Sequence, residues 1–377
     1  MRKYSRGCRQ FHKKFMSLFL AVLLSVSATS CGKTKISPNP YPSGEVIIEV
    51  TSEEEEEEEY TGKKRKIIID TDTGADDCSA IILAAKNPNV EILGVTTMVG
   101  NVGLEQSNSN ALMALEVAGC DAPVHEGSDQ RYGGKKIEAA SVFGDDGMGD
   151  AGLVHPQGEI AGKDGVNFII DMVNQYPGEV EIVSLGPATN IAKAIYRAPD
   201  VMKNVKMIWS MGTTGYGPGD ASPVAEFNVY NDVQAYKELV NSGIPLTIIG
   251  LDMCDGDAMW TNEQFEELEG VNDIGSFVAR SFGKLRLFYA KNGSVKATMN
   301  CDSLAMMCVL HPRFIKGTEK VHASCITGNG ETYGQVLFYR KGFTYDQVSN
   351  EYDYNVTLVT DVAEEKYFEM YKEAISK

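Results

Sequence analysis

The sequence predicts an α/β fold: a single domain with a mostly parallel central sheet flanked by helices. Two observations support this class. Apolar runs of strand length alternate with amphipathic runs of helix length from residue 66 to residue 377, the pattern of a parallel sheet with helices on its faces. Glycine and proline do not cluster inside that region, so nothing in it marks a second domain boundary.

The first expected strand, residues 66–70, contains three successive isoleucines, and the first expected helix follows at residues 76–86. Two acidic residues lead that helix and favour the positive end of its dipole. The further expected strands cover residues 90–97, 180–185, 205–211 and 246–251. The further expected helices cover residues 104–118, 165–175, 232–242, 273–291, 302–310 and 363–376. In such a sheet the functional residues gather at the carboxyl ends of the strands.

Residues 1–31 resemble an export signal of the bacterial lipoprotein type. The start is basic, an apolar run from Phe15 to Val26 has the length of a signal-peptide core, and small residues lead into Cys31. The run is too short to span a bilayer comfortably. We therefore expect an exported protein that is lipid-anchored at Cys31 on the bacterial cell membrane or cell surface. An ordinary cleaved signal is the alternative.

Residues 32–65 are expected to form a disordered acidic tether. The segment is rich in proline at its start and contains an unbroken run of glutamates from Glu53 to Glu59. Like charges at this density repel one another and do not offset the entropy cost of folding. Such a tether would join a lipidated cysteine to the folded domain at residues 66–377.

Composition excludes several classes of partner and site. The formal net charge of -17 argues against nucleic acid, which is bound through an excess of Lys and Arg. None of the 8 cysteines forms a Cys-x-x-Cys pair, so the chain indicates neither a zinc site nor a dense disulfide framework. The cysteines of the folded domain are expected to be small buried apolar residues, with Cys301 as the exception.

The strongest local signal is the acidic segment from Asp70 to Asp77, directly after the first expected strand. Its four carboxylates would repel one another in a folded loop unless a cation lies among them. Oxygen ligands favour Ca²⁺ or Mg²⁺. An EF-hand loop counted from Asp70 would need Gly at Ala75 and Glu at Ile81, which excludes that motif. A phosphatase with Asp70 as its nucleophile stays open at this point.

Together with four further motifs, this segment resembles the inosine–uridine-preferring nucleoside hydrolases. Residues 70–80 match the family signature DxDxGxDDxxA. Residues 96–101 resemble its TTxxGN, residues 185–190 its GPLTN turn and residues 224–228 its VAEFN segment, and the pair at 301–302 falls where the family has a late Asp. The five motifs occur in the order of the family.

The resemblance implies hydrolysis of the N-glycosidic bond of ribonucleosides, with a bound Ca²⁺ and a Rossmann-like fold. Asp72, Asp77 and Asp302 would supply carboxylate ligands, and the backbone carbonyl of Leu185 would supply another. The ribose hydroxyls and a water would complete the shell, as the high coordination number of calcium allows. Asp72 would also accept the proton of that water as general base. Asp70 is expected to have no direct contact with the metal and to support the loop that carries the ligands.

The resemblance assigns other polar residues to the ribose. Asp76 and Asn101 would bind its hydroxyls near the metal, and Glu226 and Asn228 would hold its other side for in-line attack. Carboxylates around the sugar would favour its oxocarbenium character as the base departs. Asn190 is instead expected to cap the helix that follows it.

Three positions depart from the family pattern. Cys301 stands where the best-known members have a histidine that protonates the leaving base, and in this the chain resembles a subgroup of the family with Cys in place of the active-site His. A thiol is mostly protonated at neutral pH, so Cys301 is either a poorly matched acid or a small residue that lines the pocket. Phe143 replaces a histidine in an HGxxGxG-like loop. Asp220 replaces an asparagine beside the sugar, and its charge would disfavour a phosphate there, which favours nucleosides over nucleotides.

The leading hypothesis is a metal-dependent nucleoside N-ribohydrolase whose catalytic domain covers residues 66–377. Its partners would be a small-molecule nucleoside and, through the lipid alone, a membrane. Two alternatives stay open, the phosphatase and an anchored nucleoside-binding lipoprotein without turnover. The sequence also leaves open the base preference and whether the chain forms a homo-oligomer.

Overall fold

The computed structural model describes residues 62–137, 139–293, 297–342 and 352–377. All of these fall within one compact unit. The expected export segment and residues 32–61 of the expected tether lie outside the described residues. The last residue of that tether, Arg65, already belongs to the first strand, so the fold begins earlier than we predicted.

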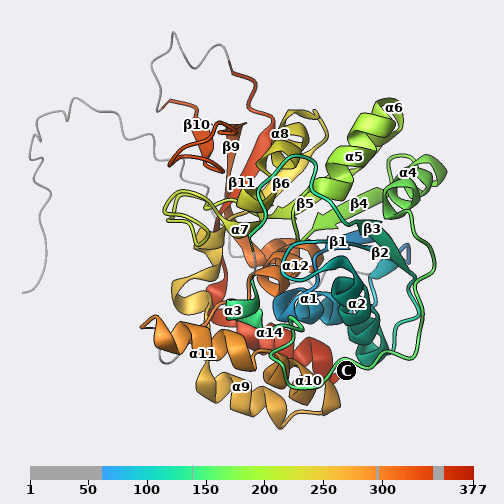
Figure 1. The fold of residues 1–377 in the computed structure, drawn as a ribbon, viewed down its shortest axis with the longest axis vertical. Coiled ribbons are helices and arrows are strands. Elements are labelled where there is room, and N and C mark those ends of the chain that lie inside the picture. The colour runs from blue at the N-terminus through green and yellow to red at the C-terminus, as the bar shows by residue number, and fades with distance from the viewer. Residues whose placement is uncertain (1–61, 138, 294–296, 343–351) are drawn as a thin grey trace, which may run out of the picture. The chain divides into compact units, whose positions relative to one another are not determined.

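A nine-stranded sheet forms the centre of the fold (Figure 1), in the order β10-β9-β11-β6-β5-β4-β1-β2-β3. Neighbouring strands pair in parallel from β11 to β3, and β9 runs antiparallel to both β10 and β11. The predicted mostly parallel sheet is therefore confirmed. The strands are β1 (Arg65–Thr71), β2 (Val90–Met98), β3 (Val124–Ser128), β4 (Val180–Ser184), β5 (Met207–Met211), β6 (Leu246–Ile249), β9 (Ile315–Cys325), β10 (Val336–Arg340) and β11 (Val356–Val362). A separate two-stranded sheet pairs β7 (Trp260–Thr261) with β8 (Ala297–Thr298).

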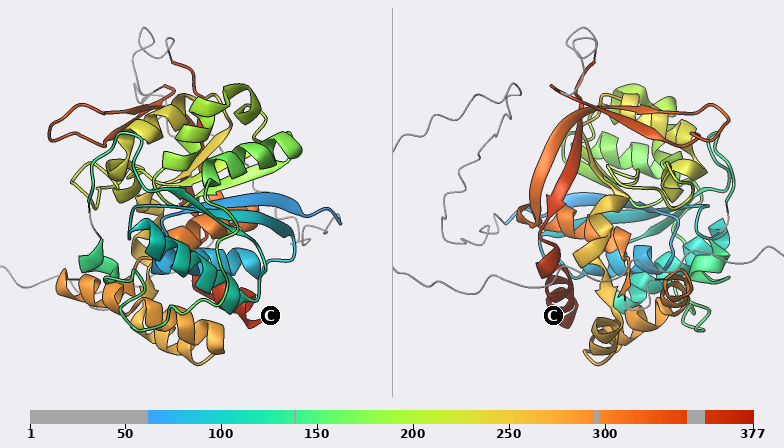
Figure 2. Two further views of the ribbon diagram at one scale, coloured as in Figure 1. Left: turned by 45° about the vertical axis from the view of Figure 1, so that its right-hand side comes forward. Right: turned by 90° about the vertical axis from the view of Figure 1, so that its left-hand side faces the viewer.

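Helices cover both faces of the sheet (Figure 2). They are α1 (Ala75–Ala85), α2 (Leu104–Ala118), α3 (Ala140–Phe143), α4 (Gly165–Gln175), α5 (Thr189–Arg197), α6 (Pro199–Met202), α7 (Phe227–Asn231), α8 (Val233–Asn241), α9 (Asn262–Glu269), α10 (Asp273–Ser281), α11 (Gly283–Lys291), α12 (Cys301–Leu310) and α14 (Glu364–Ser376). Among the described residues, none of the helices combines the length and the apolar character that crossing a bilayer requires.

The central strand β1 explains why both faces are covered. Successive side chains of a strand point to opposite faces, so Ile67 and Ile69 enter one apolar cluster while Ile68 enters the other. The first cluster contains side chains of α1, α2, α12 and α14, and the second contains side chains of α4, α5 and α8. All three isoleucines are fully buried, and β1 lies inside the sheet between β4 and β2.

Two elements differ from the expected ones for local reasons. The helix expected at residues 273–291 is divided into α10 and α11 at Phe282, whose ring is fully buried and stacks on Trp260. The strand expected at residues 246–251 ends at Ile249, because Leu251–Cys254 turns into a 3₁₀ helix, η1. Strands β3, β7, β8, β9, β10 and β11 were not expected.

Candidate active site

The acidic segment forms the turn between β1 and α1, at the carboxyl end of the central strand. β1 ends at Thr71 and α1 begins at Ala75. Gly74 precedes the helix and has no side chain with which to cap it. Its own N–H donates to Asp77 Oδ2 at 2.8 Å. The carboxylate of a residue in the first helical turn therefore caps the helix by binding the backbone of the preceding turn.

Asp77 is held by three donors in a fully buried position. Its Oδ1 accepts from the Thr71 hydroxyl at 2.5 Å, and its Oδ2 accepts from Gly74 and from Asn101 Nδ2 at 3.1 Å. Asp302, the first acidic residue of α12, lies within hydrogen-bonding range of the same carboxylate. The motif on β1 and the late Asp are therefore brought together, as the sequence predicts.

Asp72 lies in a tight backbone pocket between two glycines. Its Oδ2 accepts the Asn101 backbone N–H at 2.6 Å, while its buried Oδ1 has no hydrogen-bond partner among the described residues. A Cβ atom on Gly100 would lie 1.9 Å from Oδ2, and one on Gly186 would lie 2.7 Å from Oδ1. Glycine is therefore required at both positions, because the Asp72 carboxylate occupies the space that a larger side chain would fill.

Three carboxylates meet closely enough to hold a cation. One oxygen from each of Asp76, Asp77 and Asp302 lies within 4.8 Å of the other two. Asp76 Oδ1 is buried without a partner. Burial, and next the charge of Asp77, raises the pKa of Asp76 to about 8, and the same two causes raise the pKa of Asp302 well above its usual range. Unpaired buried carboxylates of this kind fit a hard cation that takes oxygen ligands.

This cluster differs in one respect from the ligand set that the resemblance implies. Asp76 belongs to it, whereas Asp72 does not reach the same mutual distance. Asp72 instead stands beside the cluster, with its unpartnered oxygen next to Gly186. Burial, followed by the charge of Asp77, raises its pKa strongly.

Asp70 lies outside the cavity described below and forms a brace beneath the acidic turn. It is fully buried, and its Oδ1 accepts from the Thr96 hydroxyl at 2.5 Å and from Asn190 Nδ2 at 2.8 Å. Asn190 Nδ2 also donates to the Thr97 carbonyl at 3.0 Å. The expectation that Asn190 caps the following helix is wrong. Its side chain instead binds Asp70 and Thr97 at the ends of two strands, and Ala188 occupies the cap position.

The opposite wall presents the Leu185 carbonyl, which follows β4. Asn228 Nδ2 donates to that carbonyl at 2.8 Å, so one function of Asn228 is to fix the orientation of an expected metal ligand. Glu226 caps α7: its carboxylate accepts the N–H groups of Asn228 at 2.6 Å and of Thr213 and Val229 at 3.1 Å. Burial, and then the charge of Asp220, raises the pKa of Glu226 to about 8.

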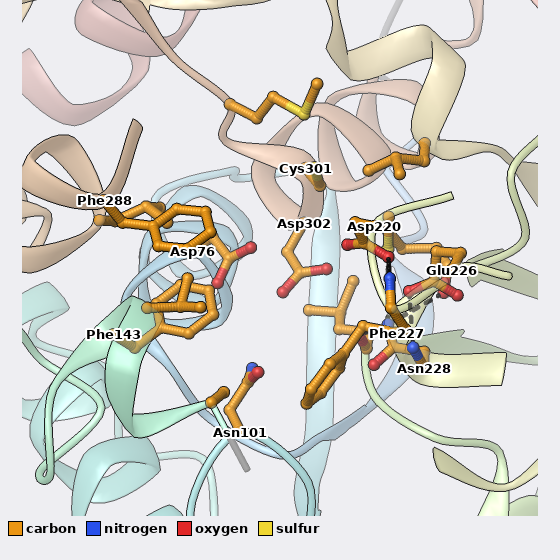
Figure 3. Close-up of a pocket in the computed structure, with 18 of the residues that line it drawn as sticks. Asp76, Asn101, Phe143, Asp220, Glu226, Phe227, Asn228, Phe288, Cys301 and Asp302 are labelled. Carbon is orange, nitrogen blue, oxygen red and sulfur yellow. Dashed lines mark hydrogen bonds between the residues drawn. The ribbon is translucent and has the colours of Figure 1, made fainter. Parts of the chain in front are cut away.

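A cavity of about 310 Å³ joins these walls (Figure 3). Among its lining residues are nine that the sequence singled out: Asp76, Asn101, Phe143, Leu185, Asp220, Glu226, Asn228, Cys301 and Asp302. Asp72 and Asp77 are not among the lining residues and lie behind the surface, where a ligand would reach them through a bound cation or water. In Figure 3 the carboxylates of Asp76 and Asp302 point toward the same open space.

The other half of the cavity is apolar and aromatic. Phe143 from α3 and Phe288 and Tyr289 from α11 line it, together with Leu285 and Met299. Figure 3 places Phe143 and Phe288 on the same side as Asp76. The two α11 aromatics were missed by the sequence interpretation. The signal was an aromatic pair inside an expected helix, and such a pair is more often part of an apolar core.

Cys301 has a neighbour that the sequence did not reveal. The Cys254 thiol at the end of η1, together with burial, raises the pKa of Cys301 well above its usual range. Both cysteines are free thiols in the structure. Cys301 therefore carries its proton at neutral pH, and it lies in the lining of the cavity.

Residues 67–369 match the model of a family described as inosine-uridine preferring nucleoside hydrolase. A uridine nucleosidase of Arabidopsis thaliana is 41% identical over 194 residues, which are 51% of this chain and 58% of that protein. The pyrimidine-specific ribonucleoside hydrolase RihB of Escherichia coli O157:H7 is 30% identical over 73% of this chain and 87% of its own length. A purine-preferring ribonucleoside hydrolase from Gardnerella vaginalis superposes with a TM-score of 0.75 at 26% identity, over 83% of this chain and 98% of that one.

Proposed function

The chain belongs to the inosine-uridine preferring nucleoside hydrolase family and hydrolyses ribonucleosides to free base and ribose, and we propose which of its residues perform each part of that reaction. The observation that carries these assignments is the pair of buried, unpartnered carboxylate oxygens, Asp72 Oδ1 and Asp76 Oδ1, at the acidic end of a ligand-sized cavity. Charged oxygens in that state need a cation or a substrate to compensate their burial.

The metal of this family would be held by Asp72, Asp77, Asp302 and the Leu185 carbonyl, and we propose that it is Ca²⁺. Carboxylate and carbonyl oxygens are its preferred ligands, and the site offers neither imidazole nor thiolate among these residues. When bound, the cation would lower the pKa of a coordinated water. Asp76, which approaches Asp77 and Asp302 to within 4.8 Å, is close enough to share the ligand shell or to bind a hydroxyl beside it.

Asp72 is the proposed general base. Its Oδ2 is fixed by the Asn101 backbone N–H, and its Oδ1 is left to accept a proton from water. Asn101 thus has two roles: its backbone aligns the base, and its side-chain amide, which donates to Asp77, lies in the cavity wall beside the ribose hydroxyls.

The sugar would lie between Asp76 and Asn101 at one end and Asp220, Glu226 and Asn228 at the other. These residues line opposite walls of the cavity. Negative groups around the ribose stabilise the positive charge that develops at its anomeric carbon when the glycosidic bond breaks. The protonated thiol of Cys301 lies on the base side and is the proposed donor to the departing base.

The phosphatase alternative receives no support from the position of Asp70. Its side chain is fully buried and absent from the cavity lining, and one of its oxygens already accepts two hydrogen bonds. A nucleophile must reach the substrate, and this carboxylate is enclosed beneath the turn. The family relationship likewise disfavours a binding protein without turnover.

A reducing-sugar assay over a panel of nucleosides tests the assignments. We expect ribose release that a chelator abolishes and added Ca²⁺ restores, and a loss of at least about 100-fold in kcat for Asp72→Ala. Asp200→Asn on the exposed helix α6 is the matched control and should behave like the wild type. Unchanged turnover in Asp72→Ala would remove the proposed base.

We also propose that the chain is exported and lipid-anchored at Cys31, with residues 32–65 as the tether. The basic start, the apolar run and the small residues before Cys31 support this proposal. In a bacterial host fed with labelled fatty acid, the wild type should carry the label and partition into detergent. Cys31→Ser should lose both properties, and Cys8→Ser should keep them. Label on the Cys31→Ser variant would contradict the anchor.

A further inference from the structure

The cavity combines negative charge with aromatic walls. Among its described lining residues are four carboxylic acids, Asp76, Asp220, Glu226 and Asp302, and none is a lysine, arginine or histidine. Asp72 and Asp77 add two carboxylates directly behind this surface. A divalent cation would neutralise only part of this charge. Burial favours the protonated form of the remaining carboxyl groups, so a positively charged ligand that enters the cavity would be compensated by their ionised form, in low-dielectric walls that strengthen the attraction.

The three departures from the family pattern all change the charge of this site in the same direction. Phe143 and Cys301 each stand in place of a histidine, and Asp220 stands in place of a neutral asparagine. The first two changes remove groups that could donate a proton or carry positive charge. The third adds a carboxylate that faces Asp76 and Tyr289 across the cavity.

The aromatic half offers a fitting surface for a charged ring. Phe143 and Phe288 stand on the base side of the cavity next to Asp76 (Figure 3). The face of an aromatic ring attracts a cation, and the attraction grows when water is excluded. Two basic side chains, Arg131 and Lys136, line a neighbouring hollow instead, where Arg131 donates to the Asn231 side-chain oxygen.

Given the proposed hydrolase function, on which this inference rests, we propose that the site acts preferentially on ribonucleosides whose base carries a positive charge. Such a base is an N-alkylated purine or another quaternised heteroaromatic ring. It is attracted by the carboxylates and the phenyl rings. It also leaves as a neutral molecule, so its departure requires no proton from an enzymatic acid.

The number of protons released per turnover distinguishes cationic nucleosides from neutral ones. The bond between the anomeric carbon and the ring nitrogen breaks, and its electron pair goes to the base, which becomes neutral. Water bonds to the anomeric carbon, and its proton goes first to Asp72 and then to solvent. Each turnover of a cationic nucleoside therefore releases one net proton, whereas a neutral nucleoside transfers that proton to its departing base.

Two substrate pairs test the preference, on the full metal-loaded enzyme. In the first pair, 7-methylguanosine and guanosine are compared at mildly acidic pH. In the second, 1-methyladenosine is the cation and 1-methylinosine is its neutral counterpart of nearly the same shape. We expect kcat/KM, after division by the uncatalysed rate of each compound, to favour the cation by about tenfold or more in both pairs. At the same mildly acidic pH in weak buffer, net proton release should accompany the turnover of 7-methylguanosine and not that of guanosine.

Two variants separate charge from mere fit. Asp220→Asn, an isosteric change, should lower the cation-to-neutral ratio several-fold, mainly through a higher KM for the cation. Cys301→Ala should lower the rate with guanosine and 1-methylinosine more than with their cationic partners. A normalised ratio near one, or a ratio that Asp220→Asn leaves unchanged, would overturn the inference while turnover of uridine and inosine upholds the hydrolase function. Failure of every nucleoside would overturn that function itself.

Discussion

The two halves of the cavity are built on different principles. In the ribose half, several polar groups are fixed by named partners: Asp77 accepts three hydrogen bonds, Asn101 aligns Asp72, and Asn228 holds the Leu185 carbonyl. In the base half, apolar side chains from α3 and α11 line the space without such a network. The difference shows that the reaction is fixed by geometry on one side, while the other side is determined by shape and charge and is free to vary.

Among substitutions that test the difference between the two halves, we expect the largest loss of activity from Gly100→Ala in the ribose half. The added methyl group would lie 1.9 Å from Asp72 Oδ2, so the carboxylate must move and lose its Asn101 hydrogen bond. A displacement of this size at a catalytic group lowers kcat by about 100-fold. Steady-state kinetics of ribose release measure it, with circular dichroism to verify the fold.

Gly103→Ala, three residues further along the same loop, is the matched control. A Cβ atom at Gly103 would meet nothing within 4 Å, and its backbone is extended at φ -66. Activity should therefore remain close to that of the wild type. Equal losses in both variants would mean that the loop, and not the position of Asp72, limits the reaction.

A smaller, pH-dependent effect is expected from removal of the metal. Without a cation, burial and the charge of Asp77 raise the pKa of Asp76 to about 8, above the value of about 4 in an unfolded chain. Such a group stabilises the fold below its unfolded pKa and loses that contribution as pH rises through its folded pKa. The Tm of chelated protein should therefore fall between about pH 5 and pH 8 relative to the calcium-loaded protein.

Asp76→Asn tests the origin of this pH dependence. The amide does not ionise, so the gap in Tm between the chelated and loaded forms should widen less with pH than in the wild type. Differential scanning calorimetry at several pH values provides the measurement. A gap that is constant with pH in the wild type would show that the buried carboxylates do not control the stability of the metal-free protein.

The smallest effect is expected in the base half, from Phe288→Leu. Leucine keeps the wall apolar but removes the aromatic face, so KM should rise by a few-fold with little change in kcat. Leu287→Ala, at the exposed neighbouring position, is the control. A loss of kcat comparable to that of Gly100→Ala would contradict the distinction between the two halves.

The ribose half could be predicted from the sequence because its residues occur in short motifs at strand ends. Asp70 to Asp77 and Gly100-Asn101 follow adjacent parallel strands, so the chain order itself places them together. The proposed metal ligand from α12, Asp302, is distant in sequence and was suggested only by the family resemblance. The fold class followed from the alternation of apolar and amphipathic runs, which is a local property of the chain.

The base half could not be predicted in the same way. Phe288 and Tyr289 reach the cavity because the chain breaks at Phe282 and α11 takes a new direction, and that break depends on packing against Trp260. Cys254 meets Cys301 across an interval of the sequence with no motif to connect them. Asparagine is a common helix-capping residue, yet the contacts of Asn190 with Asp70 and Thr97 arise only from tertiary structure.

The opposite end of β1 has a mechanical consequence. There Arg65 grips Glu181 of β4 through two hydrogen bonds, and Lys206 and Trp209 bind the same carboxylate. Under the proposed anchoring at Cys31, tension from the membrane would enter the domain at this clamp. It would act along a strand that is paired on both sides, so the load would be spread as shear over the ladders with β2 and β4. The acidic turn lies at the far end of β1, and we expect the active site to keep its geometry when the enzyme is pulled by its amino terminus.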